Sequence, residues 1–339
     1  VDYSEPEISK RAAAVTDKML SMLALHTYKT GIVAPMGRVY RSVLYPFDQG
    51  AMALMNLINP KLPYTFGEGW LGFYASSHYP IPEGLVKLME DDVETNYTTG
   101  NARVYLEKND DYCLTSVASP REPFTRWENE TLKEDVDITT HNFTKSFNER
   151  FHGTTYFRPG TYGYQQHMWY AALDGEASIF VTHPGSTSEE GDMRPGYWHG
   201  NGVMPALKQQ HGLLGGIYVI PDEHPIGYTH LYCPECRFDE VIHEENWIFL
   251  RKETGYLALW CSEKLEAHNG MNFNCEQRAY SKNAAYLCVC GGKKSDVSFA
   301  TFKKRAKETS PSYDKESKTL TAQEFKLSYA ACEDVTQFL

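Results

Sequence analysis

The spacing of apolar residues divides the chain into a short helical part and a longer part made of strands. From Pro6 to Tyr28, apolar side chains recur every three or four residues, and Ser4 with Glu7 forms a capping box, so an amphipathic helix is predicted that Gly31 ends. A second helical stretch runs from Pro46 to Asn59. Two helices this apolar are expected to pack on the following β-region or on helices that this chain does not contain.

From Leu62 onward the pattern changes to short runs rich in Val, Ile, Tyr, Phe and Trp, separated by turns rich in Gly, Pro, Asn and Asp. Runs of this kind are typical of strands. The predicted strands are Trp70–Ala75, Ala102–Glu107, Tyr112–Val117, Leu213–Ile220, Gly227–Tyr232, Trp247–Lys252, Tyr256–Cys261, Phe273–Tyr280 and Ala285–Cys290. A short helix from Val297 to Lys307 and a last strand from Leu320 to Tyr329 follow.

These patterns predict a mainly β fold, in which a short α-helical segment precedes a large antiparallel β-sandwich. The absence of alternating helices argues against a doubly wound parallel sheet. The best boundary is the stretch from Pro60 to Pro63, so residues 1–61 are assigned to the helical segment and residues 62–339 to the sandwich. A chain of 339 residues can bury a sizeable core, either as one large domain or as two moderate ones.

Charge and hydropathy limit the partners. The formal net charge of −11 disfavours nucleic acid and anionic membrane surfaces, because both attract a basic face. No apolar run approaches the ~20 residues that a membrane-spanning helix needs, so no membrane partner is predicted. The chain begins at Val1 without a basic and apolar leader, so no signal peptide is visible, and both secreted and cytoplasmic locations stay open.

Eight cysteines are too few for a disulfide scaffold in a chain of this length. Strand alternation places Cys288 and Cys290 on one face, where buried thiols are common. The run His230, Cys233, Cys236 and His243 offers four zinc ligands, but it holds one Cys-x-x-Cys and its spacing lies outside the usual finger patterns. An ordinary turn with thiols is therefore favoured, and no metal or cofactor is predicted.

The stretch from His152 to Gly202 holds the densest set of groups that bind or transform a polar substrate. Within it, His167–Leu173 and Ala177–Thr182 are predicted to be two strands joined by Asp174-Gly175, because the central positions of a tight hairpin favour residues that tolerate positive φ. Gly- and Pro-rich loops flank this hairpin. Rigid strands that carry aromatic and basic side chains toward such loops are typical of a binding cleft. Phosphate-binding and nucleophile-elbow motifs are absent from the sequence.

Three segments carry a resemblance to a known family: ALHTYKTGIVAPMGRVY, TYGYQQHMWYAALDGEASIFVTHPG and RPGYWHGNGVMP. They resemble the C-terminal half of heparinase II/III-like proteins and of the chondroitin, hyaluronate and alginate lyases. Those enzymes pair an incomplete N-terminal (α/α) toroid with a C-terminal antiparallel β-sandwich. The resemblance implies that Pro6 to Asn59 are the last toroid helices, that the rest of the toroid is a missing domain or partner chain, and that the substrate is an acidic polysaccharide cleaved by β-elimination.

Such a lyase removes a weakly acidic proton next to a carboxylate, so it needs groups that neutralise the carboxylate, a base, and an acid for the leaving oxygen. The resemblance implies Tyr40 as the acid or base, His167 as the base and Asn201 as a group that neutralises the carboxylate. The residues implied to bind substrate are Arg38, Arg158, Tyr164, Gln166, Trp169, Arg194, Trp198 and His199. The alternative interpretation is packing: Tyr40 as a loop aromatic, His167 as a hydrogen-bonded core histidine, and the two tryptophans as core residues.

Two other classes of function stay open. A glycoside hydrolase of related architecture would use a carboxylate pair such as Asp174 and Glu176, or residues on a missing domain. A non-catalytic β-sandwich would bind carbohydrate or support a partner chain. Products distinguish the three classes, because only a lyase creates an unsaturated uronate.

Overall fold

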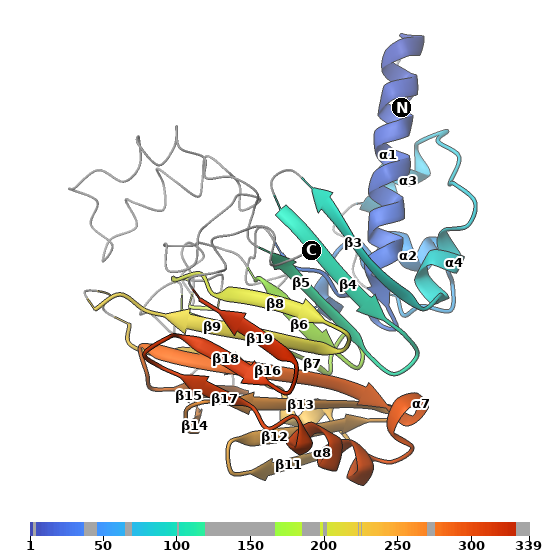
Figure 1. Cartoon of the computed structure of the whole chain (residues 1–339). Coiled ribbons are helices and arrows are strands. Elements are labelled where there is room, and N and C mark those ends of the chain that lie inside the picture. Colours follow the sequence, from blue (N-terminus) through green and yellow to red (C-terminus); the bar gives the residue numbers. More distant parts are fainter. Residues whose placement is uncertain are drawn as a thin grey trace, which may run out of the picture.

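Two antiparallel sheets dominate the structure (Figure 1), a computed structural model that describes residues 1–2, 5–36, 46–64, 70–99, 102–118, 167–184, 197–198, 202–222, 224, 226–269 and 275–329. The eight-stranded sheet has the order β14 (Leu265–His268), β15 (Glu276–Ala279), β10 (Thr229–Tyr232), β7 (Ser178–Thr182), β6 (Trp169–Ala172), β5 (Cys113–Ala118), β4 (Ala102–Lys108), β3 (Val93–Thr99). The six-stranded sheet has the order β11 (Glu240–Glu244), β12 (Trp247–Lys252), β13 (Gly255–Cys261), β16 (Asn283–Gly292), β9 (Leu213–Val219), β8 (Ala206–Gln210).

The main hydrophobic core lies between these two sheets. Leu114, Ile179 and Leu231 enter it from the eight-stranded sheet, and Leu257 and Cys288 enter it from the six-stranded sheet; all are at most 1% exposed. Each fully buried aliphatic side chain stabilises the fold by about 1.5–3 kcal/mol relative to an exposed one. The mainly β class and the sandwich predicted from the strand pattern are therefore confirmed.

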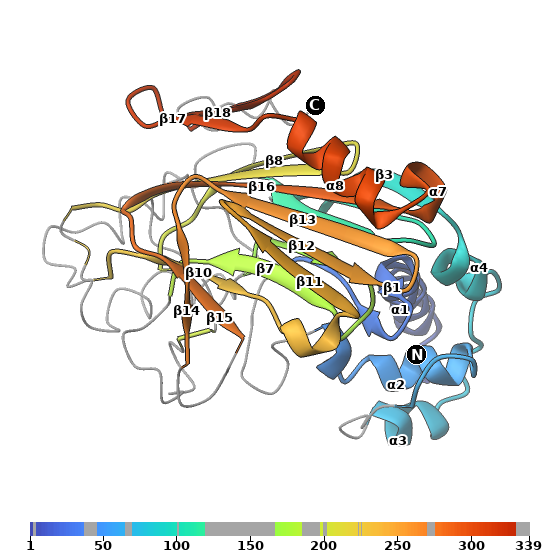
Figure 2. The ribbon, with the colours of Figure 1, turned by 90° about the horizontal axis from the view of Figure 1, so that it is seen from below.

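The other face of the six-stranded sheet is covered by the last part of the chain (Figure 2). Helix α8 (Phe299–Glu308) begins at Ser298, whose hydroxyl caps the Thr301 amide, and it packs Phe302 against Tyr256. A three-stranded sheet of β17 (Ser312–Asp314), β18 (Thr319–Ala322) and β19 (Phe325–Ser328) adds Leu320 and Phe325. Two short helical elements, η3 (Glu235–Arg237) and α7 (Lys293–Asp296), lie in the chain between β10 and β11 and between β16 and α8.

The helical part adjoins the eight-stranded sheet, and α1 (Pro6–His26) extends away from the sandwich (Figure 1). The other elements of this part are β1 (Thr27–Tyr28), β2 (Gly31–Ile32), η2 (Pro46–Asp48), α2 (Met52–Ile58), α3 (Trp70–Ala75) and α4 (Leu85–Glu90). Leu20, Ala24, Met52, Met55 and Leu85 form its separate apolar core. Within the described ranges, no helix has the length and apolarity to span a lipid bilayer.

His26 ties the end of α1 to the sheet. Its Nδ1 lies 2.7 Å from the Val33 carbonyl oxygen, and its Nε2 lies 2.8 Å from the Tyr97 hydroxyl on β3. Burial lowers the pKa of His26 to about 4, so the ring is neutral at pH 7 and can donate through Nδ1 while it accepts from Tyr97.

The region from Leu62 to Asp92 differs from the prediction. Trp70–Ala75, predicted to be a strand, is helix α3, and the first strand of the sandwich begins at Val93. The run Trp-Leu-Gly-Phe-Tyr-Ala is short and apolar without strict alternation, a pattern that does not distinguish a strand from a buried helix. At the other end, Leu320 to Tyr329 contains the hairpin of β18 and β19 in place of one strand, because Gln323 adopts a φ of +48° between them.

The predicted hairpin between β6 and β7 is confirmed, but its turn works differently from the prediction. Asp174 Oδ1 accepts hydrogen bonds from the amides of Glu176 (2.8 Å) and Ala177 (2.6 Å). Gly175 does not have a positive φ. It is needed because a Cβ there would lie 2.7 Å from the Thr30 backbone, which places the hairpin turn directly against the β1–β2 turn.

Candidate functional site

His167 lies where the helical part joins the eight-stranded sheet. Its backbone exchanges two hydrogen bonds with Met36, of 2.9 and 3.0 Å, just before β6 begins. Its fully buried ring has Nδ1 2.6 Å from the Tyr170 hydroxyl and Nε2 2.6 Å from the Trp198 carbonyl oxygen. Because a carbonyl oxygen can only accept, Nε2 carries a proton, and with that proton on Nε2 alone the ring accepts the Tyr170 hydroxyl at Nδ1.

Tyr170 therefore presents its proton to His167. Its side chain is fully buried, and this burial raises the pKa of the phenol well above its usual value of 10. The two side chains therefore form a buried hydrogen-bonded pair, the Tyr170–His167 pair, in which Tyr170 is the donor and His167 the acceptor.

A buried ionic cluster lies further along the same face of the sheet. Glu276 and Arg278 project from β15 and His230 from β10, and each of the three residues is at most 7% exposed. Glu276 Oε1 lies 2.7 Å from Arg278 Nε and 3.3 Å from His230 Nδ1, and it also accepts the Tyr197 hydroxyl. These four side chains form one hydrogen-bonded network centred on a carboxylate.

The hydrogen bonds of this network decide the charge of Glu276. Burial opposes its ionisation, but hydrogen bonds from His230, Arg278 and Tyr197 outweigh burial and lower the pKa of Glu276 to about 2. Burial raises the pKa of Tyr197 far above 10, and its bonds to Glu276 and Tyr228 raise it further. Glu276 is therefore a fixed anion and Tyr197 a fixed hydrogen-bond donor at neutral pH.

Trp198 connects the cluster to His167. Its indole stacks on the His230 ring with centroids 4.0 Å apart and planes 10° apart, while its carbonyl oxygen binds His167 Nε2. Between the ionic cluster and His167, Phe180 stacks on Tyr232, with ring centroids 4.9 Å apart. Aromatic rings thus separate the Tyr170–His167 pair from the ionic cluster and hold both in place.

The two predicted tryptophans have different surroundings. Trp198, 3% exposed, lies on the polar and aromatic face of the sheet, and one face of its indole already contacts His230. Trp169, 1% exposed, packs in the core between the two sheets, so the structure gives it a packing role. That either indole stacks on a sugar stays a prediction. The other predicted residues lie outside the described ranges, and their roles also stay predictions: Arg38, Tyr40, Arg158, Tyr164, Gln166, Arg194, His199 and Asn201.

The carboxylates considered for a hydrolase lie at the turn of the β6–β7 hairpin. Asp174 Oδ2 lies 2.6 Å from Lys252 Nζ, and its other oxygen caps the turn. Glu176 pairs with Arg237, with a shortest separation of 3.3 Å. Seven residues of extended chain separate Asp174 from His167, which corresponds to ~23 Å at 3.3 Å per residue. These carboxylates are therefore remote from the His167 pair and are occupied by cations.

The four residues considered as zinc ligands, His230, Cys233, Cys236 and His243, do not converge on one point. His230 turns toward Glu276, whereas His243 Nε2 lies 2.9 Å from Glu235 Oε1. Cys233 is buried and Cys236 is exposed. In the described part of the chain, no group of three or more His, Cys, Asp or Glu side chains is arranged to hold a metal ion. Cys288 and Cys290 are both buried in the core between the sheets, as the strand alternation predicted.

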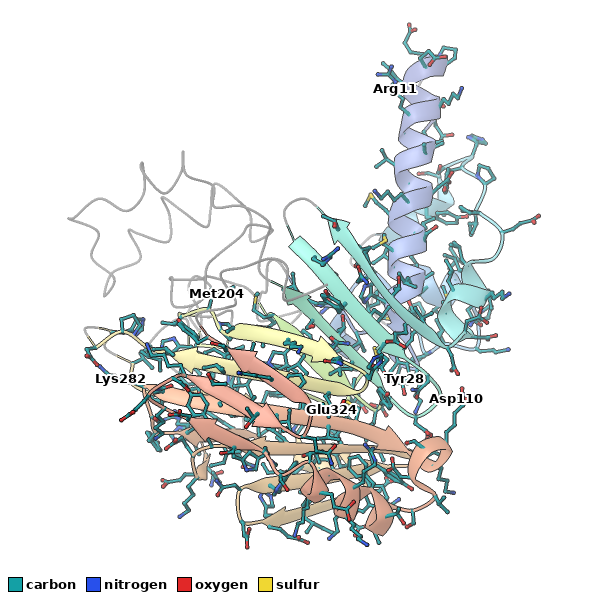
Figure 3. All side chains as sticks on the ribbon, viewed as in Figure 1. Arg11, Tyr28, Asp110, Met204, Lys282 and Glu324 are labelled. Carbon is teal, nitrogen blue, oxygen red and sulfur yellow. The ribbon has the colours of Figure 1, made fainter. Side chains whose placement is uncertain are left out.

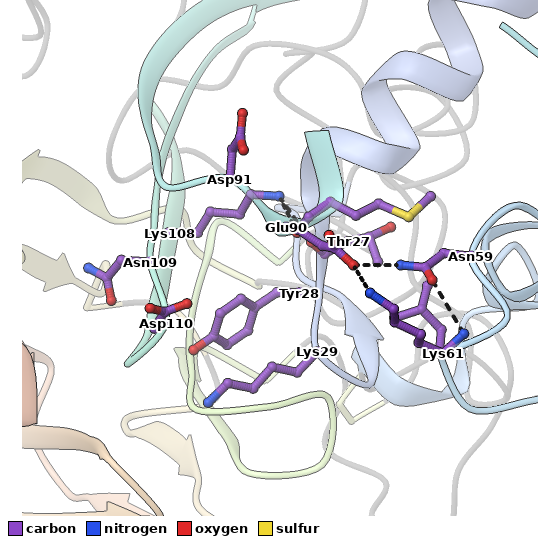
Figure 4. Close-up of a pocket in the computed structure, with 12 residues that line it drawn as sticks. Thr27, Tyr28, Lys29, Asn59, Lys61, Glu90, Asp91, Lys108, Asn109 and Asp110 are labelled. Atoms are coloured by element: carbon purple, nitrogen blue, oxygen red, sulfur yellow. Dashed lines mark hydrogen bonds and ion pairs between the residues drawn. The ribbon is translucent and has the colours of Figure 1, made fainter. Parts of the chain in front are cut away.

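A cavity of about 260 Å³ lies where the helical part meets the sandwich (Figure 4). Lys108, 2% exposed at the end of β4, lies in its wall and donates to the carbonyl oxygens of Thr27 (3.1 Å), Leu88 (2.6 Å) and Met89 (3.2 Å). Burial lowers the pKa of Lys108 to about 8. Nearer the surface, Lys61 pairs with Glu90 at 3.2 Å.

A second, apolar cavity of about 480 Å³ lies within the helical part, lined by residues of α1 and α2 such as Leu23 and Leu54. Beside it, α1 exposes Ile8, Val15 and Met19, each at least 53% accessible to solvent. The helical part therefore presents an apolar surface that the sandwich does not cover.

The polar face of the eight-stranded sheet depends on residues that the sequence prediction missed: Lys108, Glu276 and Arg278. Lys108 continues the buried positions of Val104 and Leu106 along β4, whereas Glu276 and Arg278 alternate with Ala279, which faces the core between the two sheets, so the pattern gave no sign that these two charges are buried. An inward-facing charged residue is uncommon, and such residues mark functional or paired positions. No protein-family model and no curated protein matches this chain.

Proposed function

We propose that this chain is a polysaccharide lyase, or the C-terminal portion of one, that cleaves a uronate-containing polysaccharide by β-elimination. The observation that carries the proposal is the hydrogen bond from the Tyr170 hydroxyl to His167 Nδ1, on a sheet face that also holds the buried cation of Arg278. An imidazole, a phenol and a guanidinium are the groups that this chemistry requires.

In this proposal, the reaction begins when a base removes the proton next to the uronate carboxylate. Positive and hydrogen-bonding groups stabilise the enolate that develops, and the predicted groups for this task are Asn201 or Gln166, with Arg158 or Arg194. The electron pair then expels the glycosidic oxygen at the neighbouring carbon, which leaves a double bond in the uronate. Tyr40 protonates the leaving oxygen. The first proton goes to the Tyr170 oxygen as the Tyr170 hydroxyl passes its own proton to His167 Nδ1, which is the base of the reaction.

The apolar surface of α1 supports a further part of the proposal, the helical partner. Ile8, Val15 and Met19 lie on one side of α1, and the apolar cavity lies beside them. Exposed apolar side chains grouped on one side of a helix are typical of an interaction site. We expect further helices, as another domain or another chain, to cover it.

A second candidate function is a non-catalytic β-sandwich that binds carbohydrate or supports a partner. The burial of His167, with both ring nitrogens in hydrogen bonds, favours this candidate, because a base must reach its substrate. In that case, the Tyr170–His167 pair would be a structural link between the helical part and the sheet.

One incubation separates these functions. The chain is mixed with alginate, polygalacturonate, hyaluronan and heparin, and ultraviolet absorbance, reducing ends and retention on each polymer are measured. A lyase raises the ultraviolet absorbance because it forms an unsaturated uronate. New reducing ends without absorbance would indicate a hydrolase, and retention without cleavage would indicate a binding module; either result contradicts the lyase.

Tyr40→Phe gives the sharpest variant. It removes only the hydroxyl that the proposal assigns to the leaving oxygen, and general acid–base groups contribute about 10²- to 10⁴-fold to the rate. The initial rate of absorbance increase should fall by that factor, whereas Tyr64→Phe, at an exposed position of the helical part, should leave it unchanged. Equal rates for Tyr40→Phe and the unsubstituted chain would remove Tyr40 from the mechanism.

A further inference from the structure

The side chains of Tyr197 and Trp198 are both held at one carboxylate. The Tyr197 hydroxyl donates directly to Glu276 Oε1. The Trp198 indole stacks on His230, with ring centroids 4.0 Å apart, and His230 Nδ1 lies 3.3 Å from the same Oε1 atom. The Tyr197 ring also packs edge-on against His230, with ring centroids 4.8 Å apart. Two separate contacts therefore fix these neighbouring residues with respect to Glu276.

The backbone at Trp198 determines where the His167 ring carries a proton. The Trp198 carbonyl oxygen lies 2.6 Å from His167 Nε2, and because a carbonyl oxygen can only accept, this nitrogen carries a proton. The other ring nitrogen, Nδ1, lies 2.6 Å from the Tyr170 hydroxyl. If the Trp198 carbonyl moved away, the Nε2 proton would lose its acceptor in a fully buried site. Either nitrogen could then carry the proton, and the direction of the hydrogen bond with Tyr170 would no longer be fixed.

Three donors meet on a single oxygen of Glu276. Besides Tyr197 and His230, the Arg278 side chain contributes its Nε atom, which lies 2.7 Å from Oε1. Burial raises the pKa of Glu276, but the hydrogen bonds outweigh it and lower this pKa to about 2, so the carboxylate accepts them throughout the neutral range. Arg278 and His230 are direct partners across the paired strands β15 and β10. The sheet therefore fixes the position of the Glu276 oxygen.

We propose that Glu276 is a positioning residue for His167. Glu276 holds Tyr197 and His230, and these two side chains hold the Trp198 carbonyl. The carbonyl keeps a proton on His167 Nε2, so that Nδ1 is the nitrogen that faces the Tyr170 hydroxyl. The hydrogen bond at one ring nitrogen of a histidine generally decides the state of the other. This role rests on the proposed function only where His167 acts as a base; the place of the proton is observed without substrate.

The test follows the Nε2 proton of His167 by nuclear magnetic resonance, in the full chain with isotope-labelled histidine and without substrate. His167→Gln identifies the resonance, because its signal disappears. Tyr197→Phe removes the hydroxyl bonded to Glu276 and keeps the ring. Exchange of the Nε2 proton with water should then become about fivefold faster, as expected when the loss of one hydrogen bond favours local opening. His230→Ala, which removes the ring beneath the Trp198 indole, should accelerate the exchange at least as much.

Tyr112→Phe is the matched control. The Tyr112 hydroxyl donates to a carboxylate of β4 and the residue is 9% exposed, so the substitution removes the same kind of bond. Tyr112 adjoins Cys113, whose partner in β6, Ala172, lies five residues after His167, or ~17 Å along extended chain. Tyr28, which packs in one cluster with Cys113, lies at the α1 end of the sandwich (Figure 3). Tyr112→Phe should leave the exchange of the His167 proton unchanged.

Two results would overturn the role of Glu276. Equal exchange rates in Tyr197→Phe and the unsubstituted chain would mean that the Trp198 carbonyl stays in place without the carboxylate. Equal acceleration in Tyr197→Phe and Tyr112→Phe would mean a general loss of stability. Cleavage tests the lyase separately. Faster exchange in Tyr197→Phe alone, with no polymer cleaved by the unsubstituted chain, would keep the role of Glu276 and reject the lyase, and cleavage with unchanged exchange would do the reverse.

Discussion

Glu276 and Lys108 are both buried charges on the polar face of the eight-stranded sheet. The surroundings favour the charged form of Glu276 and disfavour the charged form of Lys108. Three donors, His230, Arg278 and Tyr197, surround Glu276 and lower its pKa to about 2 despite burial. Among the described residues, the hydrogen bonds of the Lys108 ammonium go to three backbone carbonyl oxygens, and burial lowers its pKa to about 8. Burial therefore disfavours a charge only where no countercharge or sufficient set of hydrogen bonds compensates it.

The largest expected effect comes from Glu276→Gln. The substitution keeps the shape of the side chain but leaves the buried Arg278 without its countercharge, so the free energy of unfolding should fall by about 3 to 5 kcal/mol. Urea denaturation followed by circular dichroism measures this change. Glu244→Gln, at a surface carboxylate paired with Lys303 and Lys307, should change stability by less than about 1 kcal/mol. Equal losses in the two variants would contradict the contrast between buried and exposed pairs.

The pH dependence sharpens this result. A carboxylate whose folded-state pKa lies near 2 stabilises the fold above its unfolded pKa of about 4.5, and this stabilisation is lost as the pH falls toward 2. The stability difference between the unsubstituted chain and Glu276→Gln should therefore shrink as the pH is lowered from about 4.5. A difference that stays constant over this range would mean that Glu276 is not ionised in the fold.

Lys108→Met should have a smaller effect. It removes a buried ammonium but leaves three carbonyl oxygens without their donor, so we expect a loss of about 1–3 kcal/mol at pH 7. Lys61→Met, in the wall of the same cavity but exposed, is the control and should cost less than about 1 kcal/mol.

The sign of the pH effect at Lys108 is opposite to that at Glu276. Because the folded-state pKa of about 8 lies below the usual 10.5, the unfolded chain binds the extra proton between these values, and stability rises with pH. The unsubstituted chain should therefore gain stability relative to Lys108→Met between pH 8 and pH 10, as measured by denaturation at each pH. A relative loss over this range would show that the ammonium is well compensated.

The smallest expected change in stability is that of Tyr170→Phe. It removes one buried hydroxyl next to His167, which corresponds to about 1 kcal/mol. Tyr286→Phe removes a buried hydroxyl bonded to Thr229 in the core between the two sheets, and it should lower the free energy of unfolding by a similar amount. Activity separates the two variants, because only Tyr170→Phe should slow cleavage. If both variants retain the full rate of absorbance increase, the Tyr170–His167 pair has no role in catalysis.

The sequence allowed the prediction of features that depend on local patterns. The periodicity of Pro6 to Tyr28 predicts α1, the Asp174-Gly175 pair predicts the β6–β7 hairpin, and the alternation at Cys288 and Cys290 predicts their shared face. Trp70–Ala75 was wrong because a short apolar run without alternation fits a helix as well as a strand.

The network around Glu276 could not be predicted in the same way, because it depends on contacts between distant parts of the chain. Glu276 meets His230 from 46 residues away and Tyr197 from 79 residues away. No local pattern encodes such pairing. A weaker signal was present, since Lys108 continues the inward positions of Val104 and Leu106 and thereby marks itself as a buried charge. The roles of Tyr40, Asn201 and the predicted arginines stay predictions.

Two links between the helical part and the sheet bear on thermal unfolding. They are the paired hydrogen bonds between Met36 and His167 and the contact of Gly175 with Thr30. Backbone from the helical part is joined to the sheet at both ends of the β6–β7 hairpin, so unfolding of either part breaks its contacts with the other. We therefore expect one calorimetric transition for the whole chain, with amide exchange at Met36 and in β6 governed by the same global opening. The helical and sandwich parts would then be regions of one cooperative unit.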